Sequence, residues 1–219
     1  MNNSMIQLIV LAVIAVFLIL KLRSILGTRE GFEKPAIRPE DVRPRARAGL
    51  EVINGGPDRD ITDHAPEGSD AAKALAAMKG AEPSFSVNTF LQGARGAYEM
   101  ILMAYEKGEL DKVRPFLSAD VENTFEDAIR ARDDQGLSVD ANFVGLRELV
   151  LQDAHYDATT KTAEIVVRHV GELTSVVRNK AGEVIEGSPT EIKKQRDIWT
   201  YARRMGVDDP NWQLVATGD

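Results

Sequence analysis

The sequence contains no cysteine and only three histidines among its 219 residues. The missing thiols exclude a disulfide framework, thiolate ligation of zinc or an iron–sulfur cluster, and a cysteine nucleophile. Lys and Arg number 27 against 34 Asp and Glu, so the formal net charge is −7. That balance differs from the broad cationic surface of a nucleic-acid binder. We therefore expect no metal, no other cofactor and no nucleic-acid partner, although a 43% hydrophobic fraction can supply a core.

Charge is missing altogether from the first 20 residues. From Leu8 through Phe17 to Leu20 every residue is Leu, Ile, Val, Phe or Ala. A helix of that length spans roughly 30 Å, the thickness of a hydrocarbon core, and its insertion is favoured by about 4 to 7 kcal/mol. A cleaved signal peptide is disfavoured, since no basic stretch precedes the run and no small-residue cleavage site follows it. We predict an uncleaved transmembrane anchor over residues 1–23.

The charges that flank this anchor predict its orientation. No Lys or Arg precedes the apolar run, whereas Lys21, Arg23 and Arg29 follow it closely. The positive-inside rule then places everything after the anchor in the cytoplasm. The same basic flank can also contact anionic lipid headgroups. We expect a single-pass protein of the inner (plasma) membrane with its C-terminal domain in the cytoplasm.

Residues 24–84 have the composition of a flexible linker. They contain six of the nine prolines and little hydrophobic periodicity, so they should not form a core. As flexible coil they would reach roughly 45 Å. An Ala-rich stretch near residues 70–79 predicts a short helix, with Ser69 or Asp70 as its cap and Gly80 at its end. Because so short a helix is marginal alone in water, we expect it to dock on the following domain, the bilayer or a partner.

Residues 85–219 contain the patterns of a folded domain, and they hold the whole charge excess of −7. Ser86 is placed to cap a long helix, whose apolar residues recur every three or four positions until Gly108. A short helix bent by Pro115 follows. Ser118 caps a third helix, which ends at Gly136.

After Gly136 the hydrophobic period changes from helical to strand-like. Alternating, β-branched stretches predict strands near 139–156, 162–177, 191–205 and 212–217, with turns at 157–160 and 179–182. Three helices followed by an antiparallel meander indicate an α+β fold, in which a curved sheet wraps around the long helix. A cone of this kind keeps an apolar cavity between helix and sheet, where a ligand or peptide can bind.

Four stretches carry a resemblance to a known family. They are residues 90–94 (FLQGA), 116–121 (FLSADV), 197–203 (DIWTYAR) and 211–217 (NWQLVAT). Together they resemble the C-terminal domain of the mitochondrial inner-membrane import-motor scaffold, in the form seen in alphaproteobacterial membrane proteins. The resemblance covers residues 85–219 and implies a nuclear-transport-factor-two-like cone, no enzymatic activity, and a scaffold or adaptor role at the inner membrane.

Four aromatic residues are the candidates for a pocket or partner-binding site. Tyr98 and Tyr105 lie on the inner helix, and Trp199 and Trp212 lie on the last two predicted strands. The tryptophans can instead simply fill the core, and this is the interpretation that we favour. The glycine-rich stretch 93–96 is in mid-helix and does not follow a strand, so it is no phosphate loop. We expect its small residues to let the sheet approach the helix.

The remaining polar residues offer little chemistry. The histidines at 64, 155 and 169 have no metal-ligand spacing and are expected at the surface or on a sheet face. The strand patterns place no clear carboxylate in the interior beside the tyrosines, which disfavours an enzyme. The leading hypothesis is a membrane-anchored adaptor that binds a protein partner, in protein transport or membrane-complex assembly. Two alternatives stay open: a cone-fold small-molecule binder or enzyme, and a periplasm-facing assembly component of an envelope machine.

Overall fold

The computed structural model of the chain describes residues 56–218. The predicted anchor over residues 1–23, the cations predicted to set its orientation and the first part of the predicted linker lie outside these described residues. Between residues 56 and 218, no helix is long and apolar enough to cross a membrane.

The longest helix, α4 (Val87–Lys107), has the ends that the sequence predicts. The Ser86 hydroxyl accepts a hydrogen bond from the Thr89 amide at 3.3 Å, and Gly108 closes the helix in the left-handed conformation. Helix α5 (Ala119–Asp134) begins in the same way at Ser118. The expected helix around Pro115 is instead two 3-10 turns, η1 (Leu110–Lys112) and η2 (Arg114–Phe116). A proline has no amide hydrogen to donate, which favours short turns over a continuous helix.

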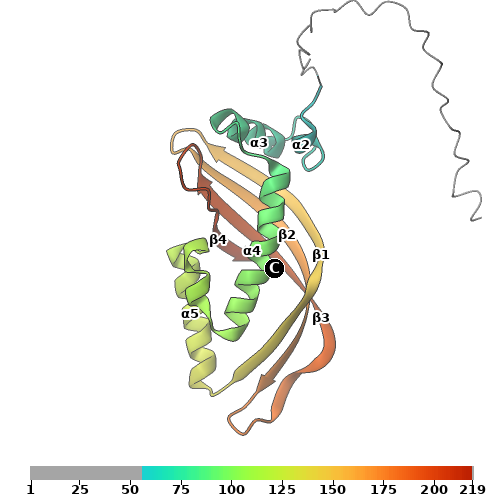
Figure 1. Cartoon of the computed structure of the whole chain (residues 1–219), viewed down its shortest axis with the longest axis vertical. Coiled ribbons are helices and arrows are strands. Elements are labelled where there is room, and N and C mark those ends of the chain that lie inside the picture. Colours follow the sequence, from blue (N-terminus) through green and yellow to red (C-terminus); the bar gives the residue numbers. More distant parts are fainter. Residues whose placement is uncertain (1–55, 219) are drawn as a thin grey trace, which may run out of the picture. The chain divides into compact units, whose positions relative to one another are not determined.

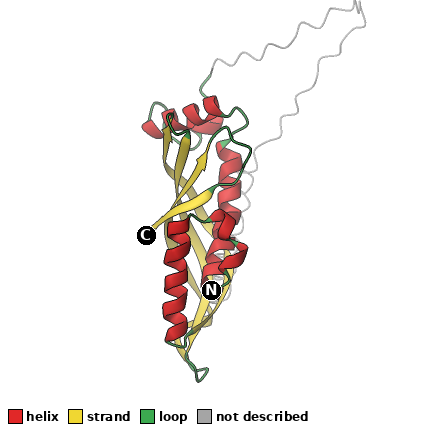
Figure 2. Cartoon of the chain, turned by 90° about the vertical axis from the view of Figure 1, so that its left-hand side faces the viewer, coloured by secondary structure: helices red, strands yellow, loops and turns green. Residues whose placement is uncertain are grey.

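Four antiparallel strands in the order β1-β2-β3-β4 form one curved sheet. Their bounds are β1 Ser138–Asp157, β2 Thr162–Arg178, β3 Val184–Arg204 and β4 Gln213–Gly218. The sheet bends around α4, and α5 lies on the same side (Figures 1 and 2). The structure confirms the α+β class and the meander. The register pairs Val167 of β2 with Trp199 of β3, and Trp199 with Thr217 of β4.

Two helices before α4 belong to the folded body. They are α2 (Arg59–Thr62) and α3 (Asp70–Ala81), and Leu75 and Met78 of α3 are completely buried. The predicted linker, which would run to residue 84, is therefore wrong at its C-terminal end. The expected helix at 70–79 is confirmed and slightly longer. It docks on the domain, and this burial supplies the stability that so short a helix lacks alone.

A single carboxylate fastens this N-terminal pair of helices to α4. Asp60 accepts hydrogen bonds from the backbone amides of Val87 at 2.8 Å and Asn88 at 2.9 Å, and it pairs with Lys79 at 2.7 Å. Burial acts to raise the pKa of Asp60, but these hydrogen bonds outweigh it and hold the pKa well below its ordinary value. Asp60 thus acts as a second cap for the α4 N-terminus, from 27 residues away in the sequence.

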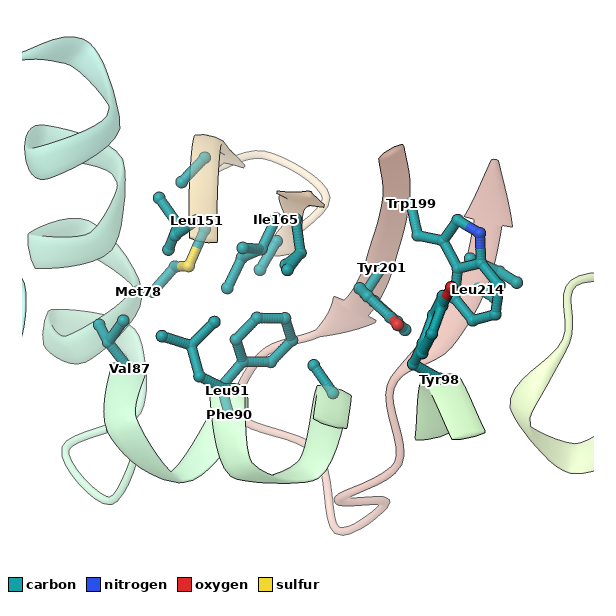
Figure 3. Packing of buried hydrophobic residues seen from close by; sticks show 14 of the residues in the cluster. Met78, Val87, Phe90, Leu91, Tyr98, Leu151, Ile165, Trp199, Tyr201 and Leu214 are labelled. Atoms are coloured by element: carbon teal, nitrogen blue, oxygen red, sulfur yellow. The ribbon is translucent and has the colours of Figure 1, made fainter. Parts of the chain in front are cut away.

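The hydrophobic core lies between α4 and the concave face of the sheet. Figure 3 shows α3, α4 and the strands each contributing side chains to it. Its large, fully buried members include Met78, Tyr98, Ile165, Tyr201 and Leu214. Ile61 of α2 and Leu75 and Met78 of α3 belong to the same buried cluster as residues of α4 and the strands, so both helices share the core of the domain.

Candidate functional site

An open groove of about 690 Å³ runs beside α4, and we call it the α4 groove. Its floor is one face of α4, and its walls come from the connection before α4, from η2 and from the region where β3 leads into β4. The lining residues are Glu82, Ser84, Phe85, Ser86, Thr89, Phe90, Gln92, Gly93, Ala94, Gly96, Ala97, Met100, Phe116, Tyr201, Arg203, Pro210, Asn211 and Trp212. A volume of this size fits a peptide segment or a small ligand.

Trp212 forms the aromatic wall of the groove. Its ring centre lies 4.7 Å from that of Phe90 and 6.0 Å from that of Phe85. The guanidinium carbon of Arg203 lies 5.3 Å from the Trp212 ring centre, a cation–π contact. Trp212 is half-buried, so one part of its surface holds the fold while the rest stays available to a partner.

The groove floor is made of very small side chains. At Gly93 and Gly96, an added Cβ would meet no described heavy atom within 4 Å, other than those of its own helix turn and chain neighbours. The expectation that these glycines let the sheet approach the helix is therefore wrong. That close approach occurs instead at Gly171 of β2, where an added Cβ would lie 2.7 Å from the Tyr98 hydroxyl oxygen. Gly93 and Gly96 face the open groove.

An ion pair closes one end of the groove. Arg203 donates a hydrogen bond to Glu82 at 2.6 Å, and the Gly206 amide donates another to the same carboxylate at 3.0 Å. Burial acts to raise the pKa of Glu82, but the bonds from Gly206 and Arg203 outweigh it and lower the pKa. The pair joins the α3–α4 connection to the end of β3, which fixes the width of the groove there.

The four sequence-predicted site residues lie in different surroundings. Only Trp212 lines the α4 groove. Tyr98 and Trp199 are core residues, 0% and 3% exposed. Tyr105 packs on Phe125 of α5, with ring centres 4.7 Å apart. Tyr201, which was not among the residues predicted from the sequence, also lines the groove.

A buried polar cluster lies beneath α4, on the concave face of the sheet. The Tyr98 hydroxyl donates to Asp197 at 2.6 Å, and the Tyr201 hydroxyl lies 3.3 Å from Nε2 of His169. The His169 ring stacks on Tyr98 at 4.5 Å between ring centres. The expectation of no interior carboxylate is wrong at Asp197. The missed signal was its parity, because Asp197 stands two and four residues before Trp199 and Tyr201 and so shares their face.

Burial governs the protonation of this cluster. Burial, and then the Asp197 carboxylate, raise the pKa of Tyr98 above its ordinary value, and burial also raises that of Tyr201. Burial lowers the pKa of His169 to about 4, so the ring is neutral at physiological pH. Tyr98 and His169 are 0% exposed and line neither cavity found in the described part. The Tyr98 hydroxyl and Nε2 of His169 thus have partners within the cluster, whereas Nδ1 of His169 is buried without one.

The other two histidines lie apart from this cluster. His155 is exposed, as expected, and pairs with Asp153 at 3.2 Å. His64 contacts the Asn88 side chain at 3.0 Å, so it belongs to the contact between α2 and α4. In the part of the chain that the structure describes, no group of three or more acidic or histidine side chains is placed to hold a metal ion.

Comparison with known proteins identifies the domain. Among solved structures, the intermembrane-space region of the chloroplast protein ARC6 aligns with a TM-score of 0.43 and 12% sequence identity, over 62% of this chain and 97% of that one. No match was found among curated proteins. The Tim44-like domain matches residues 71–219, a span that includes nearly all of α3 and every later element. The chain therefore belongs to the Tim44-like domain family.

Proposed function

We propose that this chain is a membrane-anchored, non-enzymatic adaptor that holds a segment of a protein partner in the α4 groove. Proteins of the Tim44-like family are generally non-catalytic scaffolds, which supports this assignment. The complete burial of Tyr98 and His169, which line neither cavity of the described residues, supports it too. Protein transport or the assembly of a membrane complex is the setting that we infer for it.

The observation that carries the proposal is the pair of glycines on the groove floor. A glycine within a helix destabilises it by roughly 0.5–1 kcal/mol relative to alanine. Neither Gly93 nor Gly96 has a positive φ, and neither has a described neighbour that a methyl group would displace. The fold alone therefore gains nothing from them. A bound partner would gain from these glycines, because glycine lets a second backbone approach the helix closely.

The membrane part of the proposal rests on the sequence. The uncharged run ending at Leu20 and the cations from Lys21 onward support an anchor with a cytoplasmic domain. Reporter fusions after Asp219, one active only in the cytoplasm and one only outside, test this orientation. A cytoplasmic signal is expected. An external signal would contradict the orientation and favour the periplasm-facing assembly component.

Site-specific photocrosslinking in native membranes tests the groove. A photoreactive residue at Gln92, which lines the groove, should crosslink the full chain to one reproducible protein. The matched control is Arg95, which is exposed on the same helix but does not line the groove. Equal crosslinking at both positions, or none at either, would contradict the proposal. A small molecule that co-purifies with the chain and raises its melting temperature would favour the ligand-binding alternative.

Alanine at the two glycines provides a second, independent test. Gly93→Ala with Gly96→Ala should weaken partner capture while raising stability, and these opposite signs exclude misfolding as the cause. Gly80→Ala is the matched control, since Gly80 is also helical, also has open space around it and lies outside the groove. The control should leave capture unchanged. Undiminished capture by the double variant would contradict the use of this floor.

A further inference from the structure

The sheet has a convex face on the side away from α4 and α5 (Figure 1). A second cavity lies on this face. We call it the convex hollow. Four cations line it, Arg147, Arg168, Lys194 and Arg196, and the side chains of Val170 and Ile198 give it apolar surface. These residues come from the neighbouring strands β1, β2 and β3, and the pairing of these strands holds their backbones in place.

The cations in the hollow outnumber the carboxylates. Arg147 pairs with the buried Glu172 at 2.7 Å, and Arg168 pairs with Glu148. Lys194 and Arg196 are exposed and make no ion pair with any residue between 56 and 218. The hollow thus has an excess of two positive charges on a chain whose formal net charge is −7. Two cations remain free to bind an anionic partner.

The free cations have the spacing of an extended chain. Lys194, Arg196 and Ile198 alternate along β3, in a stretch that keeps an unbroken register with β2, so all three point to the convex face. Residues two apart on a strand repeat at about 6.6 Å. Tyr201 and Arg203, which line the α4 groove, have the opposite parity on the same strand. The hollow and the groove therefore lie on opposite faces of the sheet.

We propose that the convex hollow binds an extended acidic segment of a partner protein. Two carboxylates of that segment, two residues apart, pair with Lys194 and Arg196, and an apolar side chain at the next position of the same parity packs on Ile198. A flat anionic membrane is the poorer fit, because the acidic remainder of the domain would be repelled by it. This surface is separate from the α4 groove and does not depend on the function proposed for it.

Fluorescence anisotropy tests the proposal with the full chain in nanodiscs of phosphatidylcholine. The probe is a labelled peptide with two aspartates and one leucine at alternate positions, and a peptide with asparagine at the two acidic positions is its control. Charge reversal by Lys194→Glu with Arg196→Glu should weaken binding of the acidic peptide about tenfold or more. The matched variant, Lys107→Glu with Arg204→Glu, makes the same change in net charge at two exposed cations outside the hollow, and it should change binding less than about twofold.

Several outcomes would overturn the proposal. Equal binding of the acidic and asparagine peptides would do so, as would equal losses in the two charge-reversed variants. Absence of peptide binding at low salt would overturn it as well. If the wild type instead sediments with vesicles of phosphatidylglycerol, or self-associates, and only Lys194→Glu with Arg196→Glu abolishes this, the hollow binds a membrane or a second copy. The Gly93→Ala and Gly96→Ala variant should retain peptide binding, which keeps the two proposals distinguishable.

Discussion

The two faces of α4 differ in side-chain size and in what covers them. Tyr98 and Ile101 face the sheet and are completely buried, whereas Gly93 and Gly96 face the α4 groove and Met100 beside them is 39% exposed. The buried face packs against the core. On the open face the glycines lower helix stability but leave the helix backbone accessible. One face of the helix thus serves folding, and the other serves the proposed binding. Substitutions on the buried face should lower stability, and substitutions on the open face should alter partner binding.

The largest effect is expected from a truncation on the buried face. Ile101→Ala should lower the free energy of unfolding by about 3 kcal/mol, because it removes a buried side chain and leaves a cavity. Met100→Ala, one residue away on the open face, should change it by less than about 0.5 kcal/mol. Urea denaturation measures both. Similar losses at the two positions would show that the groove face is also part of the core.

A pH titration probes the buried face without altering its shape. The pKa of His169 is lowered to about 4 by burial, against about 6.5 in the unfolded chain. The unfolded state therefore takes up a proton first as the pH falls, and stability is lost between about pH 6.5 and pH 4. We expect about 2 kcal/mol of this loss between pH 7 and pH 5. His169→Phe, which keeps a flat ring against Tyr98, should remove this part of the slope; an unchanged slope would place the titrating group elsewhere.

A smaller effect is expected at the N-terminus of the helix. Asp60→Ala removes the carboxylate that accepts from Val87 and Asn88, and it should cost about 1–2 kcal/mol. Asp63→Ala is the control, since Asp63 is exposed and its side chain makes no hydrogen bond to the described residues. Thermal unfolding of both variants gives the difference. A loss no greater than that of the control would mean that Ser86 alone caps α4.

The smallest expected effect is a gain in the free energy of unfolding rather than a loss. Gly93→Ala should raise the free energy of unfolding by about 0.5–1 kcal/mol, because alanine restricts the unfolded chain and nothing described obstructs its methyl group. Urea denaturation detects a change of this size. A destabilised Gly93→Ala variant would show that the open face of α4 is more tightly packed than the groove indicates, and the comparison of the two faces would fail.

The parts of the fold that could be predicted from the sequence are those that neighbouring residues determine. Ser86, Gly108 and Ser118 act within a turn of their own helices, and the change of hydrophobic period after Gly136 predicts the strands from neighbouring residues. Trp212, the one predicted site residue in the groove, was a candidate because an aromatic residue on the last predicted strand can line a pocket or fill the core. Its partner in the groove wall, Phe90, lies far away in the sequence.

The parts that could not be predicted depend on contacts between distant residues. Asp60 bonds to Val87, and Tyr98 bonds to Asp197 across 99 positions of the sequence. No local pattern marks the partners in either pair, so residues 56–69 resembled a linker. The parity of Asp197 indicates its face of the sheet but not its partner. The open face of α4 was hidden for a similar reason. A small residue in a helix predicts close approach, but only the tertiary structure shows whether a sheet or empty space lies opposite.

The attachment through Asp60 also has a mechanical consequence. A pulling force on the chain ahead of residue 56 reaches α2 first and then the bonds from Asp60 to the α4 amides, before it loads the sheet. The bonds of Asp60 and the core contacts of α2 and α3 meet this force first, whereas the long β1–β2 and β2–β3 ladders share a load across many hydrogen bonds. Under tension the first two helices should therefore peel away and lengthen the connection while the sheet remains intact. Detachment of the N-terminal helices would thus protect the sheet from the force.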